Sequence, residues 1–113
     1  MTARRYVPDR GDIVWLDFTP QAGHEQRGKR PALVLSPTAY NGRVDLAICC
    51  PITSQIKGYP FEVVLPEGLG ITGAVLADQV KNLDWRVRKA RLVCRAPTEI
   101  VEHVTGKLLT LVR

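Results

Sequence analysis

The sequence is poor in the residues from which metal centres and disulfide frameworks are built. Its 113 residues include only three cysteines, two histidines and one methionine. Cys49, Cys50 and Cys94 match no metal-binding spacing, and an odd number of thiols cannot form a complete set of disulfides. Adjacent residues of a strand point to opposite faces, so Cys49 and Cys50 are poorly placed to bind one ion together. We therefore expect reduced, buried cysteines and neither a metal nor another cofactor.

Long apolar runs are also absent. No segment approaches the roughly 20 apolar residues of a membrane-spanning helix, and the N-terminus lacks the apolar core of a signal peptide. These absences favour a cytoplasmic protein. The chain contains no glycine-rich phosphate loop, no His-x-Glu zinc motif and no Gly-x-Ser-x-Gly nucleophile elbow. No familiar enzyme motif therefore identifies its chemistry.

What the sequence does contain is the composition of one basic globular domain. Hydrophobic residues make up 45% and charged residues 24%, and 113 residues suffice to bury a single core. Sixteen lysines and arginines against eleven acids give a net charge of +5. This excess favours an anionic partner, with RNA or DNA ahead of a membrane because no basic amphipathic helix accompanies it. We expect residues 1–113 to form one domain, with 1–10 as a loosely ordered arm.

Short apolar and alternating stretches predict a mainly β chain. Strands are expected over residues 13–18, 32–36, 44–52, 61–65, 71–76 and 92–95. The Asn41-Gly42 pair predicts a turn, because both residues tolerate positive φ. Only the segment after Pro97 has apolar residues at helical spacing. Several short strands with one terminal helix predict a small, strongly curved antiparallel sheet or a β-barrel.

One polar pair stands at the ends of two predicted strands. Arg30 precedes the second strand and Thr53 follows the third, so the two residues meet if these strands are antiparallel neighbours. An arginine fork and a hydroxyl suit a phosphate group. A plainer alternative is a surface ion pair between Glu25 and Arg30, with Thr53 only ending a strand. His24 is a candidate acid or base, whereas His103 is expected to be a solvated helix residue.

Seven blocks of sequence follow one another in a recognisable order. They are GDIVWLDF (11–18), GHEQRGKRP (23–31), VLS (34–36), YN (40–41), PITS (51–54), KGYPFEVVL (57–65) and ADQVK (77–81). Together they resemble the MazF/PemK-type toxins, which are sequence-specific endoribonucleases of type II toxin–antitoxin systems. The resemblance runs from about Tyr6 to Val112, and so many blocks in one order are more specific than any single motif.

The resemblance implies an SH3-like barrel with a terminal helix, assembled as a homodimer. It also implies metal-independent cleavage of single-stranded mRNA that leaves 2′,3′-cyclic phosphate and 5′-hydroxyl ends. The family's catalytic arginine and threonine fall on Arg30 and Thr53, Glu25 matches an assisting loop glutamate, and His24 matches no catalytic residue. RNA-binding residues are expected at Gln26, Ser54, Gln55, Lys57, Asp78 and Gln79. The expected partner is a cognate MazE-like antitoxin whose acidic, disordered tail blocks the groove.

Two other functions are compatible with such a fold. A non-catalytic gyrase poison of the CcdB type depends on a Trp-Gly-Ile carboxyl terminus, whereas this chain ends Leu109-Thr110-Leu111-Val112-Arg113. A barrel that binds RNA without cleaving it would not need both Arg30 and Thr53. Both alternatives are therefore disfavoured.

Overall fold

The computed structural model describes residues 5–18 and 28–113, and this part of the chain forms seven strands and two helices. In chain order the elements are β1 (Asp12–Asp17), β2 (Lys29–Val34), α1 (Thr38–Val44), β3 (Leu46–Thr53), β4 (Glu62–Val64), β5 (Ala74–Leu76), β6 (Lys81–Asp84), β7 (Arg91–Arg95) and α2 (Thr98–Val112). Each of the six predicted strand segments overlaps a strand of the structure, and β6 was not predicted. The predicted C-terminal helix is also confirmed.

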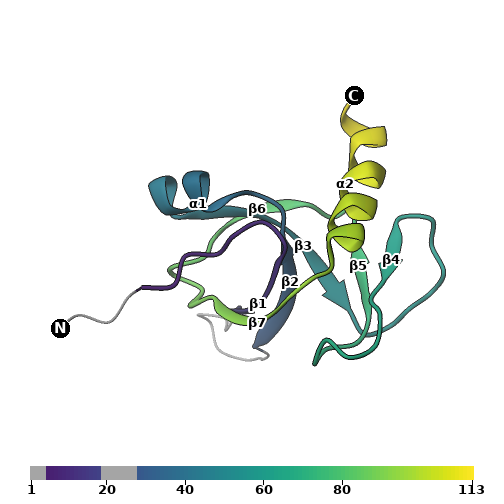
Figure 1. The fold of residues 1–113 in the computed structure, drawn as a ribbon, viewed down its shortest axis with the longest axis horizontal. Coiled ribbons are helices and arrows are strands. Elements are labelled where there is room, and N and C mark those ends of the chain that lie inside the picture. The colour runs from purple at the N-terminus through teal and green to yellow at the C-terminus, as the bar shows by residue number, and fades with distance from the viewer. Residues whose placement is uncertain (1–4, 19–27) are drawn as a thin grey trace.

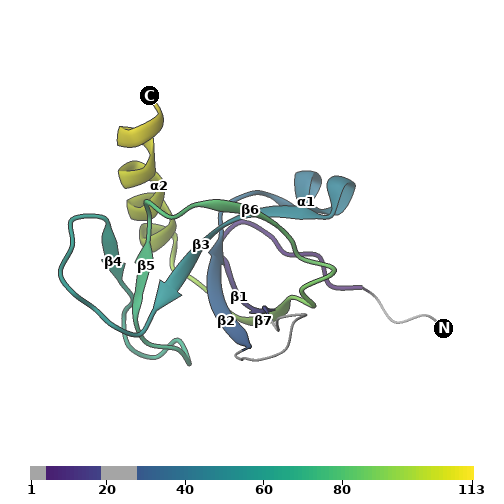
Figure 2. The same cartoon turned by 180° about the vertical axis from the view of Figure 1, so that it is seen from behind.

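The strands form one antiparallel sheet in the order β4-β5-β3-β2-β1-β7, with β6 added to β3. β3 is central because one of its edges pairs with β2, while the other pairs with β6 near its start and with β5 near its end. Figures 1 and 2 show the sheet curling strongly, with α2 beside β4 and β5 and α1 at the far end of β3. Among the described strands the pairing runs from β4 to β7 without closing into a ring. The prediction of a strongly curved antiparallel sheet with a terminal helix is confirmed.

Apolar side chains are buried on both faces of the sheet. Neighbouring residues of β3 belong to two different apolar clusters. Cys50 packs in the cluster covered by Val104 of α2, and Cys49 packs in the cluster that contains Trp85. The prediction that the two thiols lie on opposite faces is confirmed, and both are buried. Burial raises the pKa of each of these thiols to about 12.

The segment around Asn41 is helical, so the turn predicted there is wrong. α1 covers Thr38–Val44, and the left-handed residue is Asp45 at its C-cap, with φ of 62°. The Asn41 side chain is fully buried; its Nδ2 donates to the carbonyls of Pro8 and Ser36, both at 2.8 Å, and its Oδ1 accepts from the Ser36 hydroxyl at 2.6 Å. These contacts hold Asn41 inside a helix, where local turn preference does not decide the conformation.

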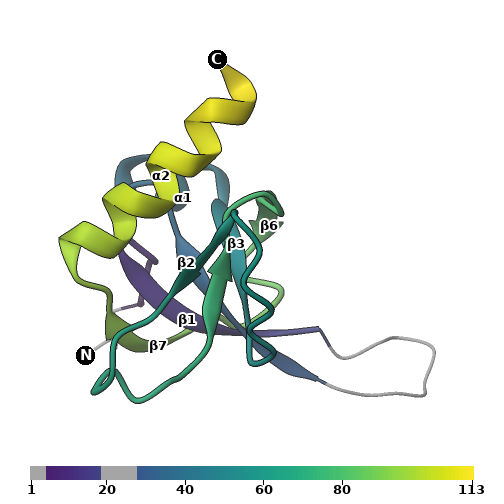
Figure 3. The ribbon, with the colours of Figure 1, turned by 90° about the vertical axis from the view of Figure 1, so that its right-hand side faces the viewer.

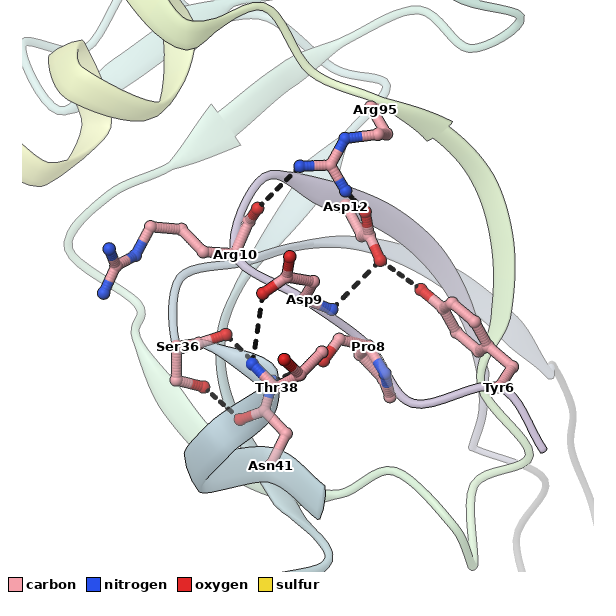
Figure 4. A network of polar contacts seen from close by, with 9 residues as sticks. All are labelled: Tyr6, Pro8, Asp9, Arg10, Asp12, Ser36, Thr38, Asn41 and Arg95. Atoms are coloured by element: carbon pink, nitrogen blue, oxygen red, sulfur yellow. Dashed lines mark hydrogen bonds and ion pairs between the residues drawn. The ribbon is translucent and has the colours of Figure 1, made fainter. Parts of the chain in front are cut away.

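Within residues 5–10, hydrogen bonds engage Tyr6, Pro8, Asp9 and Arg10 (Figure 4). The sequence favoured a loosely ordered arm over residues 1–10, of which 1–4 lie outside the described residues. The carboxylate of Asp12, only 2% exposed, accepts hydrogen bonds from the Tyr6 hydroxyl (2.5 Å), the Asp9 backbone N–H (3.0 Å) and the Arg95 guanidinium (2.5 Å). Burial and the bond to Asp12 raise the pKa of Tyr6 above its ordinary value. This buried acid therefore ties the N-terminal segment to β7.

Side by side, β1 and β2 extend away from α2 as a two-stranded ribbon (Figure 3). β2 begins at Lys29, three residues earlier than predicted, so Arg30 lies within the strand rather than before it. Neither described helix is long and apolar enough to span a lipid bilayer.

Candidate active site

The register of the central strands sets Arg30 opposite Thr53. β2 pairs with β3 so that Ala32 faces Pro51 and Val34 faces Cys49. Continued by two residues beyond Ala32, the same register aligns Arg30 with Thr53, the last residue of β3. Directly opposite residues of an antiparallel pair present their side chains on the same face. In the sequence argument, the meeting of Arg30 and Thr53 depended on these two strands being antiparallel neighbours, and the structure meets that condition.

Arg30 and Thr53 line one cavity of about 540 Å³, here called the Arg30 cavity. Other residues that line it are Trp15, Ile52, Ser54 and Thr72. Arg30 is exposed, and within residues 5–18 and 28–113 no hydrogen bond or ion pair engages its guanidinium. Its planar set of N–H donors is therefore open to an incoming anion.

Thr53 is held in place by its own turn and by β5. Its Oγ1 accepts a hydrogen bond from the backbone N–H of Gln55 at 3.0 Å, which leaves the hydroxyl proton available for another acceptor. Its backbone pairs with Ala74 of β5. The residue before Ala74, Gly73, approaches so closely that a Cβ built on it would lie 2.2 Å from the Thr53 carbonyl oxygen. The position of Thr53 thus depends on a glycine that the sequence analysis did not single out.

A second cavity, of about 200 Å³, adjoins the first at Thr53 and is here called the Lys57 cavity. Four of the predicted RNA-binding residues line it: Gln55, Lys57, Asp78 and Gln79. Ser54, which was predicted with them, lines the Arg30 cavity instead. Tyr59 and Glu62, which were not predicted as site residues from the sequence, also line the Lys57 cavity. Both lie in the KGYPFEVVL block (57–65), so the family resemblance of that block could have identified them as site residues.

A third cavity, of about 280 Å³ and here called the Phe18 cavity, adjoins both of the others. It shares Arg30 with the Arg30 cavity and Gln79 with the Lys57 cavity, and Lys81 adds a second cation. The guanidinium carbon of Arg88 lies 4.3 Å from the centre of the Phe18 ring, a cation–π contact. Three adjacent hollows therefore surround the Arg30–Thr53 pair, each bordered by polar or cationic side chains.

Three candidate residues of the charged loop, His24, Glu25 and Gln26, lie outside the described residues. His103 is exposed on α2, as predicted. Across residues 5–18 and 28–113, no group of three or more histidine, cysteine, aspartate or glutamate side chains is arranged to hold a metal ion. The chemistry that the described site offers is that of hydrogen-bond donors and fixed positive charge.

Comparison with known proteins gives concordant matches over nearly the whole chain. The profile of a family described as PemK-like, MazF-like toxin of type II toxin-antitoxin system matches residues 9–112. The endoribonuclease toxin MazF of Escherichia coli (strain K12) is 48% identical over 108 residues, which cover 96% of each chain. A crystal structure of MazF from Deinococcus radiodurans matches with a TM-score of 0.86 and 59% identity, over 96% of this chain and 98% of that one. A MazE–MazF crystal structure from the same organism matches with a TM-score of 0.87 and 53% identity, over 96% and 97%. The family match includes the strands that carry Arg30 and Thr53.

Proposed function

The chain belongs to the PemK-like, MazF-like family of toxins of type II toxin–antitoxin systems, and we propose that it is an endoribonuclease that cleaves single-stranded RNA at the Arg30 cavity. The observation that carries this proposal is that Arg30 and Thr53, which align when the register of β2 with β3 is continued past Ala32, line one cavity. A guanidinium fork and a hydroxyl donor suit a phosphodiester. The net charge of +5 favours a polyanionic substrate.

The proposed reaction is an internal transesterification. The ribose 2′-OH attacks the adjacent phosphorus, so that the O2′–P bond forms while the P–O5′ bond breaks. The products are a 2′,3′-cyclic phosphate and a 5′-hydroxyl end. Arg30 binds the non-bridging oxygens through two N–H groups, and the Thr53 hydroxyl donates a third hydrogen bond as charge develops on the phosphoryl group. DNA lacks the attacking hydroxyl, so it is an inhibitor at best.

Two proton transfers complete the reaction. The 2′-OH proton must leave as the O2′–P bond forms, and O5′ must gain a proton, from water or a protein acid, as it departs. Arginine side chains remain protonated in proteins, so Arg30 is unsuited to the role of base. We assign the 2′-OH proton to Glu25. If that assignment is right, Glu25→Gln removes the acidic limb of the pH–rate profile; an unchanged limb would exclude Glu25.

The neighbouring cavities hold the nucleotides on either side of the cleaved bond. In the Lys57 cavity the amides of Gln55 and Gln79 offer hydrogen-bond donors and acceptors to a base edge, and Lys57 faces the RNA backbone. Tyr59 is 59% exposed, so its ring is free to stack on an unpaired base. Gln26 and Ser54 contribute further contacts, and Asp78 offers an acceptor to a base amino group. Unpaired bases are required, because paired bases cannot turn their edges into these hollows.

The proposal extends to the assembly and the partner. A second copy of the chain would cover the apolar end of α2, where Leu109, Leu111 and Val112 are 40%, 53% and 67% exposed. The solved MazE–MazF structure supports a MazE-like antitoxin as the partner of this toxin. An acidic, disordered tail of that antitoxin would block the three cavities by charge and by bulk. Such a toxin acts on RNA in the cytoplasm.

Purified protein and its Arg30→Ala variant, incubated with mixed-sequence single-stranded RNA in EDTA, test the proposal. The wild type should give discrete cuts with 2′,3′-cyclic phosphate ends, and Arg30→Ala should give none. Arg43→Ala is the matched control, because it removes one exposed arginine from α1 instead. Intact RNA from a folded wild type would refute the ribonuclease and favour a barrel that only binds RNA; gyrase inhibition would then be tested. Cuts that persist in Arg30→Ala would refute the site.

A further inference from the structure

A single carboxylate holds the tip of the loop between β3 and β4. Glu62, the first residue of β4, accepts a hydrogen bond from the Gly58 backbone N–H at 2.9 Å on Oε1. The Lys57 N–H lies 3.1 Å from the same oxygen and 3.2 Å from Oε2. Two consecutive N–H groups aimed at one anion form a small nest, and the left-handed φ of 78° at Gly58 permits that shape.

The bonds to Glu62 hold the backbone from which the Lys57 and Tyr59 side chains project. Lys57 Nζ lies 5.8 Å from the centre of the Tyr59 ring, and the Tyr59 carbonyl accepts from the Glu62 backbone N–H at 3.0 Å. From α2, Lys107 donates to the carbonyl of Pro60 and so holds the other end of the same loop. Without the Glu62 acceptors, a loop that contains a glycine would gain conformational freedom at its tip.

The loop forms one wall of the Lys57 cavity, which also contains Thr53. The backbone that carries the Lys57 and Tyr59 side chains is thus held on that wall by a residue that is itself half-buried. Preorganised groups bind a flexible ligand more tightly because their ordering is complete before the ligand arrives. The order of the loop that carries Lys57 and Tyr59 therefore affects how tightly the nucleotide beside the cleaved bond is bound.

We infer that Glu62 is a positioning residue, which sets the RNA affinity and base preference of the Lys57 cavity by holding the Lys57 and Gly58 N–H groups. Glu62 acts through the loop and has no contact with the reacting atoms. The inference rests on the proposed function, because it names the residue that shapes the substrate site of that ribonuclease.

The substitutions at Glu62 separate its role as acceptor from its charge. Glu62→Gln keeps an Oε1 that can accept from both N–H groups but is neutral, whereas Glu62→Ala removes every acceptor. We expect Glu62→Ala to raise KM for single-stranded RNA by about tenfold and to broaden the base preference next to the cut, while kcat falls less than about threefold. Glu62→Gln should retain most of the wild-type KM and selectivity. Glu67→Ala, in the exposed turn after β4, removes the same charge as a control.

Two measurements do not depend on cleavage. Amide hydrogen exchange should show protection of Lys57 and Gly58 in the wild type and Glu62→Gln, and loss of protection in a folded Glu62→Ala. Binding of an uncleavable single-stranded 2′-O-methyl RNA should weaken in Glu62→Ala alone. A wild type that cuts no RNA would overturn only the proposed function. The inference about Glu62 would still be tested by these two measurements. Wild-type affinity and selectivity in Glu62→Ala would overturn the inference, as would Glu62→Gln behaving like Glu62→Ala.

Discussion

Replacement of Gly73 by alanine should displace Thr53 within the proposed active site without changing the chemistry of any side chain proposed to contact RNA. A Cβ at position 73 would lie 2.2 Å from the Thr53 carbonyl oxygen and 3.3 Å from a methyl group of Ile52. Real Cβ contacts almost never fall below 3.0 Å, so the start of β5 and the end of β3 must separate by about 0.8 Å. The φ of 135° at this position adds backbone strain for alanine.

The expected loss of activity follows from that displacement. A shift of about 1 Å in a catalytic group can lower the rate by about a hundredfold, so kcat should fall by that order in Gly73→Ala. Overpacking should also lower the free energy of unfolding by about 1–3 kcal/mol. Single-turnover cleavage below the melting temperature of the variant measures the first effect, and urea unfolding measures the second.

Gly68→Ala is the matched control, because Gly68 also has a left-handed φ, of 91°, but nothing lies within 4 Å of its added Cβ. It should lose only about 1–2 kcal/mol of stability to backbone strain and should keep its cleavage rate. A folded Gly73→Ala that cleaves RNA at the wild-type rate would refute the reasoning. Equal losses of rate in both variants would show that backbone strain matters and that the contact with Thr53 does not.

Three further predictions concern charge and protonation. Arg30→Lys should lower kcat by at least about tenfold, because an ammonium keeps the charge but loses the two-pronged donor, whereas Arg43→Lys should cleave normally. Asp12→Asn should lower the free energy of unfolding in urea by about 1–3 kcal/mol, because it weakens a buried acceptor of Tyr6 and Arg95, without changing kcat. Stability should fall as pH rises above 9, the ordinary pKa of a thiol, because unfolding then releases protons that native Cys49 and Cys50 keep up to about pH 12. In Cys50→Ala this decline should be shallower by up to about 1.4 kcal/mol per pH unit, and an identical decline would contradict the assignment.

The features that could be predicted from the sequence are those that local pattern determines. Apolar stretches located the strands, helical spacing located α2, and the two-residue period of a strand separated Cys49 from Cys50. The pairing of β2 with β3 was a condition of the sequence argument, and the structure meets it. The positions of the strand ends, together with that condition, were enough to suggest that Arg30 and Thr53 lie near each other.

The features that were missed depend on contacts between distant segments. The helix at Asn41 is held by the carbonyl of Pro8, 33 residues away, so an Asn-Gly turn preference was misleading. β6 consists of Lys-Asn-Leu-Asp, which has no strand signature, and its partner Leu46–Cys49 supplies the reason for its extended conformation. Gly73 resembles an ordinary loop glycine in the sequence, and only the fold places it against Thr53.

The proximity of the two proposed catalytic residues depends on the register between β2 and β3 more than on the two side chains themselves. Because Arg30 and Thr53 come from different strands, a slip of one residue between β2 and β3 would turn one of them to the opposite face of the sheet. The buried residues that flank the pair in each strand, Ala32 with Leu33 and Cys50 with Ile52, oppose such a slip because it would exchange the contents of the two apolar clusters. Gly73 then fixes the position of Thr53 from the edge of β3 that pairs with β5, because it approaches the Thr53 carbonyl closely. Substitutions in these core and turn positions should therefore affect catalysis through geometry, even where they leave every proposed RNA contact in place.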